Sequence, residues 1–248
     1  MIVIHQEILP GVFRTVLRMP DLEMPPLPGQ FFQIEPSPGL FPVTRRPLTV
    51  NSVNGENIEV IFDVVGRGTA IMAGMTQGSF LRVLGPLGQG WNTGRRGDWL
   101  LIGGGLGAAG FHFLAHSVDC CGILMGASSV NRLLPLDCSC DVLVATEDGS
   151  AGTRGLVTDL ISEEILKKAG NIALCGPVAM MEAVWNCIPE LFRDRIQVST
   201  ESRMGCGWGV CEGCSIPVAG GGYSKCCSDG PVFPGRLIDW ERWKEAGL

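Results

Sequence analysis

Short runs of alternating apolar and polar residues fill roughly the first ninety positions of the chain. They are rich in β-branched and aromatic residues, and Pro- and Gly-rich breaks such as residues 25–29 separate them. Closely spaced strands with turns of this kind are typical of a small antiparallel barrel or sandwich. We therefore predict an antiparallel β-barrel over residues 1–94, with strands at residues 12–19, 30–35, 48–53, 58–65 and 80–84.

The pattern changes after residues 94–98. Continuous apolar runs, which are typical of strands buried on both faces, lie at residues 99–102, 122–125, 142–145 and 172–175. Helix-like spacing appears between or after some of them, at residues 106–117, 156–168 and 178–187. Alternating strands and helices predict a parallel sheet covered by helices, and we assign this α/β domain to residues 95–199.

The last region, residues 200–248, shows almost no periodicity and is rich in Gly and Cys. Such a segment cannot bury enough apolar surface to order itself alone, so we expect a cross-link to hold it. The predicted architecture is therefore a barrel, an α/β domain and a cross-linked C-terminal lobe.

Composition narrows the classes of function. The 46% hydrophobic content excludes wholesale disorder, and a net charge of −6 without a long basic run argues against a nucleic-acid partner. The most apolar stretch, residues 99–115, contains five glycines and is too short for a membrane span. No signal peptide is recognisable, so the 11 cysteines indicate reduced thiols and a cytoplasmic location.

The cysteines near the C-terminus have the spacing of metal ligands. Cys206, Cys211 and Cys214 follow C-x4-C-x2-C, the spacing of plant-type [2Fe–2S] ligands, and Cys226 and Cys227 follow downstream. Interspersed glycines give the loop conformational freedom and expose N–H groups to sulfur. A four-cysteine zinc site is the alternative, although zinc usually prefers two C-x2-C knuckles and only one is present.

Two motifs in the barrel region could hold a phosphate. Arg46 and Thr49 lie in Arg-Pro-Leu-Thr at the start of a predicted strand, and guanidinium binds phosphate in a bidentate way. Residues 65–69, Val-Gly-Arg-Gly-Thr, lead into a short predicted helix and offer backbone N–H groups to an anion. A basic pair that is merely solvated is the simpler alternative for the first motif.

Glycine-rich and strand-terminal motifs follow in the α/β region. Residues 103–110 come after a buried strand and open a helix, which suits a dinucleotide phosphate or simply close packing. Residues 146–150 and 175–177 also end strands, where ligands of α/β sheets bind. Cys175 could face a nicotinamide there, or it could be an ordinary buried cysteine.

In this order, these motifs resemble the ferredoxin-reductase superfamily, and within it the electron-transfer subunits of NAD-dependent (class 1B) dihydroorotate dehydrogenases. The resemblance covers nearly the whole chain. Its most specific part is residues 227–233, Cys-Ser-Asp-Gly-Pro-Val-Phe, which match the family's habitual ending and select Cys227 over Cys226 as the fourth ligand. The resemblance implies an FAD-binding barrel, an NAD-binding-like domain and a [2Fe–2S] lobe.

The resemblance also implies site residues. The FAD contacts are Arg46, Pro47, Leu48, Thr49, Ile61, Phe62, Asp63, Gly68 and Thr69. The nucleotide side comprises Gly103, Gly104, Gly105, Gly107, Gly176 and Pro177, with Cys175 as the catalytic candidate. The cluster ligands are Cys206, Cys211, Cys214 and Cys227. The chain departs from the family at Thr49, where Ser is usual, at Asp63, where a basic residue is common, and at residues 109–110, which replace a proline.

The implied function is an oxidoreductase subunit that acts as an electron relay. A flavin-containing partner oxidises dihydroorotate in pyrimidine biosynthesis, and the electrons reach NAD⁺ through [2Fe–2S] and FAD; the expected complex is a heterotetramer with two of each subunit. A subunit of another complex, of the NAD(P)H:ferredoxin transhydrogenase or sulfhydrogenase type, is one alternative. A non-catalytic regulator with a zinc-stapled tail is another.

Weaker candidates have simpler explanations. His112 and His116 lie four apart on a predicted helix but lack a third metal ligand. Ser128, Ser129 and Arg132 lie where an NADP 2′-phosphate could bind, so the sequence leaves NAD or NADP open. We interpret Cys120, Cys121, Cys138 and Cys140 as cysteines without chemistry. Trp240 and Trp243 could contact another subunit or pack on the cluster lobe.

Overall fold

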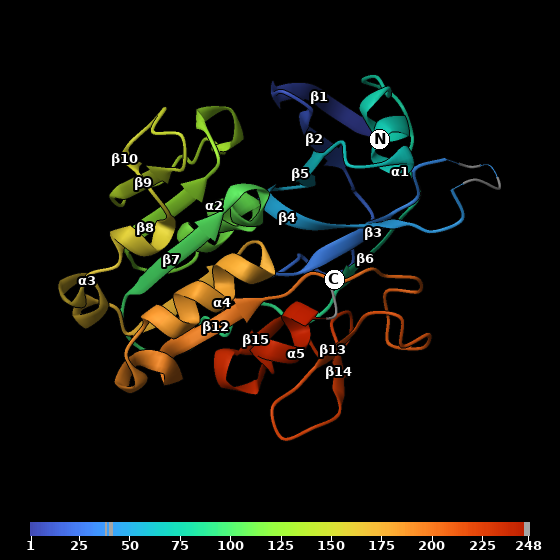
Figure 1. The fold of residues 1–248 in the computed structure, drawn as a ribbon. Coiled ribbons are helices and arrows are strands. Elements are labelled where there is room, and N and C mark those ends of the chain that lie inside the picture. The colour runs from blue at the N-terminus through green and yellow to red at the C-terminus, as the bar shows by residue number, and fades with distance from the viewer. Residues whose placement is uncertain (38, 40–41, 246–248) are drawn as a thin grey trace.

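The computed structural model describes residues 1–37, 39 and 42–245. Its first sheet has six strands in the order β1-β2-β5-β4-β3-β6, and every neighbouring pair is antiparallel. The strands are β1 (Ile2–Leu9), β2 (Val12–Arg18), β3 (Phe31–Ile34), β4 (Arg46–Asn54), β5 (Asn57–Asp63) and β6 (Val83–Leu87). They enclose an apolar core that includes Phe32, Val50 and Phe62. This sheet is the predicted N-terminal barrel (Figure 1).

The second sheet has seven strands in the order β10-β9-β8-β7-β11-β12-β15. All its pairs are parallel except β12 with β15. The strands are β7 (Trp99–Gly104), β8 (Cys120–Ala127), β9 (Val142–Thr146), β10 (Thr153–Arg154), β11 (Asn171–Cys175), β12 (Ile196–Ser199) and β15 (Val232–Pro234). The central strands β7 and β11 are buried along their whole length, as their continuous apolar runs predict.

Short helices and one hairpin complete the fold. The α-helices are α1 (Arg67–Ala73), α2 (Phe111–Ala115), α3 (Glu163–Lys168), α4 (Val178–Cys187) and α5 (Trp240–Glu245). The 3-10 turns are η1 (Gly105–Gly110), η2 (Val130–Arg132), η3 (Val157–Leu160), η4 (Glu190–Arg195) and η5 (Gly235–Leu237). Strands β13 (Ser215–Pro217) and β14 (Tyr223–Lys225) form the hairpin. Within the described residues, no helix has the length and apolarity that crossing a membrane requires.

Three predicted elements differ from the structure. The helix expected at residues 156–168 is divided into η3 and α3, because the Ser162 side chain accepts a hydrogen bond from the Ile165 N–H and starts a new helix. Residues 106–117 form η1 followed by the short helix α2 rather than one helix. The strand expected at residues 80–84 begins only at Val83, since Phe80 is 82% exposed.

The C-terminal region packs more extensively than its irregular sequence predicts. Cys214, Ile216 and Phe233 belong to the same buried cluster as Leu174 and Val198 of the parallel sheet. Trp240 and Trp243 are also buried in this cluster. The prediction that they pack on the C-terminal lobe is therefore confirmed, and the alternative that they are exposed to contact another subunit is wrong. The expectation that a cross-link alone must order this region is therefore incomplete, because the sheet supplies an apolar surface to it.

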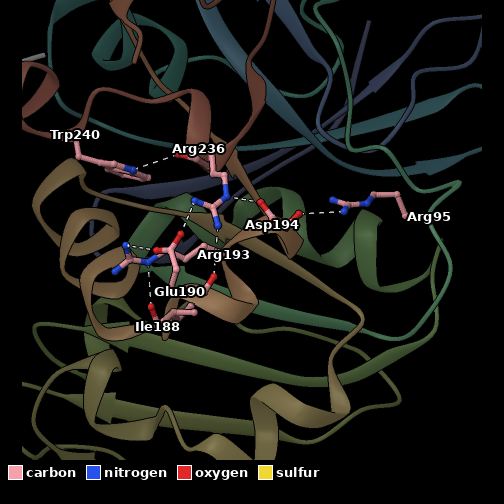
Figure 2. Close-up of polar contacts among 8 residues, drawn as sticks. Arg95, Ile188, Glu190, Arg193, Asp194, Arg236 and Trp240 are labelled. Carbon is pink, nitrogen blue, oxygen red and sulfur yellow. Dashed lines mark hydrogen bonds and ion pairs between the residues drawn. The ribbon is translucent and has the colours of Figure 1, made fainter. Parts of the chain in front are cut away.

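Charged contacts fasten the C-terminal segment to η4 (Figure 2). Arg236 of η5 forms ion pairs with Glu190, at 2.7 Å, and with Asp194. Arg95 donates to the Asp194 carbonyl at 3.0 Å, and the Trp240 ring N–H donates to the Gly235 carbonyl at 3.2 Å. Together these contacts join the C-terminal segment to η4, which directly precedes β12, and join η4 to the loop before β7.

Candidate functional site

A cavity of about 990 Å³ brings the three parts of the molecule together. Its wall includes Arg46 and Thr49 from the barrel, Cys175 from the end of β11, and Cys211 and Gly213 from the C-terminal cysteine loop. Residues far apart in the sequence, from Gly29 to Trp243, therefore share one chamber. Of the predicted flavin and nucleotide residues, those in the wall are Arg46, Pro47, Leu48, Thr49, Ile61, Phe62, Asp63, Thr69, Gly107, Cys175, Gly176 and Pro177.

Strands β4 and β5 position the flavin candidates because they are antiparallel neighbours in the barrel. Arg46 begins β4, and its Nη1 donates to the Thr44 carbonyl at 2.6 Å and to Thr44 Oγ1 at 2.9 Å. These bonds hold the guanidinium beside Gly68, where any added Cβ would overlap it. Gly68 thus lies outside the cavity wall but leaves room for the arginine that lines it.

The turn into α1 is held by Thr69. Its Oγ1 accepts hydrogen bonds from the Val65 N–H at 3.0 Å and from the Gly66 N–H at 3.2 Å. The side chain is buried and its residue lines the cavity. This threonine therefore fixes the loop between β5 and α1 against the chamber.

Asp63 has a partner that the sequence does not reveal. Its carboxylate forms an ion pair with Arg132 of η2, which joins the barrel to the α/β sheet. The guanidinium of Arg132 is therefore already paired with a carboxylate in this structure.

The glycine-rich loop divides into two roles. A Cβ on Gly103 would lie 2.8 Å from the Phe111 ring, and one on Gly104 would overlap Met180. Gly103, Gly104 and Gly105 are not in the cavity wall. Close packing explains why residues 103 and 104 are glycines. Gly107 does line the cavity, and a Cβ on it would lie 2.6 Å from the Gly176 Cα. The ends of β7 and β11 therefore meet at the chamber.

Cys175 is a neutral thiol at the end of β11. Burial raises its pKa to about 12, and the nearby Glu201 carboxylate acts in the same direction. A thiol with this pKa is protonated at neutral pH and is not a nucleophile. Cys175 can line the position of a ring or donate a weak hydrogen bond there.

The four predicted cluster cysteines form two close pairs. The Cys206 and Cys211 sulfurs each accept the other residue's backbone N–H, at 3.5 Å in both cases. Cys227 Sγ accepts from the Gly209 N–H at 3.1 Å, and Cys214 Sγ accepts from the Cys227 N–H at 3.4 Å. A [2Fe–2S] centre divides four thiolates between two irons, so paired sulfurs ringed by N–H donors fit it.

A site for a single metal ion has less support in this loop. Nowhere in residues 1–37, 39 and 42–245 do three His, Cys, Asp or Glu side chains converge as ligands of one ion would. The pKa of Cys206 is about 6: desolvation raises it, but backbone N–H groups of Cys211, Trp208 and Val210 outweigh that effect. Cys206 is therefore mainly thiolate at neutral pH, the form that binds iron.

The backbone of the cysteine loop requires its glycines. Gly207 and Gly209 have φ angles of +91° and +87°, and Glu212 is the one non-glycine with positive φ among the described residues. A Cβ on Gly207 would lie 2.7 Å from the Gln33 side chain of β3. The cysteine loop is thus pressed against the barrel strand next to β4.

The adjacent cysteines 226 and 227 point to different partners. Cys226 Sγ donates to the Thr200 carbonyl at 3.3 Å and accepts from the Thr200 hydroxyl at 3.4 Å. Cys227 Sγ instead faces Gly209 of the cysteine loop. This separation agrees with the choice of Cys227 that the family ending implies.

Sequence reasoning missed part of the cavity wall. Residues 199–205 line it from the last residue of β12 onward, and this four-residue strand is too short to stand out from its surroundings. A strand end followed by polar residues is the signal that could have found them. Gln33 of β3 does not line the cavity, but it lies against Gly207 of the cysteine loop, is fully buried, and has no hydrogen-bond partner for its amide nitrogen or oxygen in the described structure.

Comparisons with known proteins agree with this geometry. Residues 201–239 match the model of the iron-sulfur cluster binding domain of dihydroorotate dehydrogenase B. The electron transfer subunits of dihydroorotate dehydrogenase B (NAD(+)) from Bacillus cereus (strain Q1) and Bacillus anthracis (strain A0248) are each 34% identical, over 94% of this chain and 95% of theirs.

Solved structures extend the similarity to the fold. The structure of an NADH-dependent reduced ferredoxin-NADP oxidoreductase, described for flavin-based electron bifurcation, matches 98% of this chain and 91% of its own, with a TM-score of 0.84 and 28% identity. A ferredoxin NADP+ reductase from Neisseria gonorrhoeae with bound FAD and NADP matches 79% of this chain and 95% of its own, with a TM-score of 0.63 and 15% identity. The second match shows the fold alone.

Proposed function

This chain belongs to the family of dihydroorotate dehydrogenase B electron transfer subunits, and from that premise we propose that it carries electrons from a partner dehydrogenase to NAD⁺. The observation that supports this most is the shared cavity. Its wall contains the strands expected to hold FAD, the strand ends expected to face NAD and the loop expected to hold [2Fe–2S]. The chain is thus an oxidoreductase module whose expected cofactors share one chamber.

The residues of the barrel would bind and orient the flavin. FAD, when bound, exchanges single electrons for the electron pair of a hydride. Arg46 would bind the pyrophosphate through its positioned guanidinium, with Thr49 on the same strand donating from its hydroxyl. Pro47, Leu48, Ile61 and Phe62 would enclose the apolar part of the cofactor and exclude water. Asp63 would act through Arg132 rather than as a lone carboxylate.

The nicotinamide side of the chamber would be formed by Gly107, Cys175, Gly176 and Pro177. Two glycines in contact let a flat ring approach the backbone closely. The protonated Cys175 would pack against that ring without taking part in proton transfer.

The partner would approach the cysteine loop. Cys206, Cys211, Cys214 and Cys227 would hold the cluster, and exposed Trp208 and Val210 lie between the first two of them. Exposed aromatic residues favour protein interfaces. We propose that the partner is a flavin-containing dehydrogenase that oxidises dihydroorotate in pyrimidine biosynthesis, in a heterotetramer of two of each chain.

Further parts of the proposal concern organisation. The division into residues 1–94, 95–199 and 200–248 is supported by the two sheets and the cysteine loop, although β15 of the last region joins the second sheet. A cytoplasmic location is supported by 11 cysteines, a number suited to a reducing compartment.

One observation favours a second candidate function. The similarity to the NADH-dependent reduced ferredoxin-NADP oxidoreductase covers 98% of the chain, so a subunit of a transhydrogenase-type complex would use the same sites with a different partner.

The nucleotide preference rests on Arg132. Its guanidinium is paired with the Asp63 carboxylate and is therefore not free to bind a 2′-phosphate, which favours NAD over NADP.

Reconstitution with the partner tests the proposal. We expect dihydroorotate-dependent reduction of NAD⁺ to require both chains, and NADP⁺ to be a much poorer acceptor. If the complex reduced ferredoxin or NADP⁺ with NADH and ignored dihydroorotate, the second candidate function would replace the first.

A further inference from the structure

Three cysteines outside the cofactor chamber gather on one side of the parallel sheet. The Cys140 thiol donates to the Cys120 sulfur at a distance of 2.9 Å. Cys138 lies two residues before Cys140 and donates to its carbonyl at 3.6 Å. A disulfide needs a sulfur–sulfur distance of about 2.05 Å, so a shift of about 1 Å would bring Cys120 and Cys140 to bonding distance. This contact between Cys120 and Cys140 is one that the sequence spacing does not reveal.

The strand geometry selects Cys120 rather than its neighbour. Successive side chains of a strand point to opposite faces. Cys120, the first residue of β8, is partly buried and packs against the same apolar cluster as Cys138 and Cys140. Cys121 packs against the cluster on the other face, where its thiol donates to the Trp99 carbonyl at 3.3 Å. The structure thus supplies a control residue beside the reactive candidate.

The second sulfur comes from an unusual crossover. Parallel strands are normally joined through an α-helix, but β8 and β9 are joined by residues 128–141, which contain only the turn η2. The crossover is held by Leu134, which belongs to this cluster, and by Leu133 and Leu136, which pack against it. Cys140 lies at its end, two residues before β9 begins. A covalent bond from Cys140 to β8 would therefore fix a connection that has no helix.

The two thiols are protonated at neutral pH. Burial raises the pKa of Cys120, and burial together with the Cys120 contact raises the pKa of Cys140 to about 11. Both side chains are only partly buried, so a small reagent can reach them. No three ligating side chains converge anywhere in the described part of the chain, so the geometry here is that of a dithiol rather than of a metal site.

We propose that Cys120 and Cys140 are a redox-active dithiol that closes to a disulfide by exchange with a low-molecular-weight disulfide. The small thiolate fraction of one of the two cysteines attacks the reagent and releases one thiolate, forming a mixed disulfide, so the exchange is slow at neutral pH and faster at higher pH. The second protein thiolate attacks that protein sulfur and expels the other reagent thiolate. The two cysteines lose two protons and two electrons in total, and the reagent disulfide becomes two thiols.

The test uses the full chain with its cofactors, equilibrated anaerobically in buffers of oxidised and reduced glutathione. Free thiols are then alkylated, and the tryptic peptides are analysed by mass spectrometry. Cleavage after Arg96, Arg132 and Arg154 places Cys120 and Cys140 in different peptides. We expect these peptides to become cross-linked as the buffer is made more oxidising, and Tm to rise by roughly 5 °C.

Variants identify the sulfurs. Cys121→Ser is the matched control and should still form the cross-link, whereas Cys120→Ser and Cys140→Ser should lose both the cross-link and the rise in Tm. Cys138→Ser should retain them. If Cys120 and Cys140 were alkylated independently in every buffer, or if the cross-link survived in Cys140→Ser through Cys138, the proposal would be overturned.

Discussion

At the residue scale, single contacts distinguish Cys227, which we propose as the fourth cluster ligand, from its neighbour Cys226. Cys226 and Cys227 are adjacent and almost completely buried, yet only Cys227 faces the cysteine loop. The C-x4-C-x2-C spacing alone does not distinguish Cys226 from Cys227. The resemblance of residues 227–233 to the family's ending selects Cys227. The Cys226 side chain is engaged by Thr200, which lies in a different part of the chain.

The pair offers a matched substitution. Cys227→Ala should lose most of the iron and labile sulfide, because it removes a ligand. Cys226→Ala should keep both and lose only about 1 kcal/mol of stability through its Thr200 contacts. Iron and sulfide analysis after anaerobic purification checks this. Loss of iron from Cys226→Ala with retention in Cys227→Ala would reverse the assignment.

Arg46 is the residue on which flavin binding should depend most. A charge-assisted hydrogen bond is worth roughly 1.5–3 kcal/mol, so Arg46→Ala should raise the FAD dissociation constant by about 10- to 100-fold. Arg46→Lys keeps the charge and should lose less. Flavin fluorescence titration of the deflavinated protein measures both, and an unchanged affinity in Arg46→Ala would remove this arginine from the flavin site.

At the scale of elements, the fit of the cysteine loop against β3 gives a sharp test. Gly207→Ala would place a methyl group 2.7 Å from Gln33 at a φ of +91°. We expect the free energy of unfolding to fall by about 2 kcal/mol and iron to be released faster to a chelator. Gly220→Ala is the control, since its φ is also positive but a Cβ there would meet nothing. Equal effects of both variants would show that backbone strain alone matters.

Elements were predictable where one periodicity extended over several residues. Helix α4 occupies the predicted residues 178–187, and β7 and β11 follow their continuous apolar runs. The prediction of one helix at residues 156–168 was wrong because the Ser162 hydroxyl caps the start of a second helix, α3. Strand β1 escaped prediction because its pattern of apolar and polar residues is irregular, as befits an edge strand.

At the scale of the whole molecule, the cavity could not be read from periodicity. Its wall combines β4, the end of β11, residues 199–205 and the cysteine loop. Only the resemblance of the ordered motifs to one superfamily indicated that these parts act together. The pairing of Cys120 with Cys140 had no such guide, because it depends on the path of an irregular crossover.

The exposed face beside the cysteine loop predicts where the partner binds. Trp208 is 51% exposed and Val210 is 73% exposed. Trp208→Ala should weaken binding of the partner by about 2 kcal/mol, roughly 30-fold, without changing iron or flavin content. Phe80→Ala, which removes an exposed aromatic residue between α1 and β6 of the barrel, is the control. Analytical ultracentrifugation distinguishes them, and equal partner affinity in both variants would place the interface elsewhere.

The most direct test of the central claim is the cofactor content of the chain purified anaerobically with its partner. The electron-relay account predicts about two irons, about two labile sulfides and about one FAD for each copy of this chain, with both flavin and cluster bands in the visible spectrum. A colourless chain with one zinc and no flavin would contradict it.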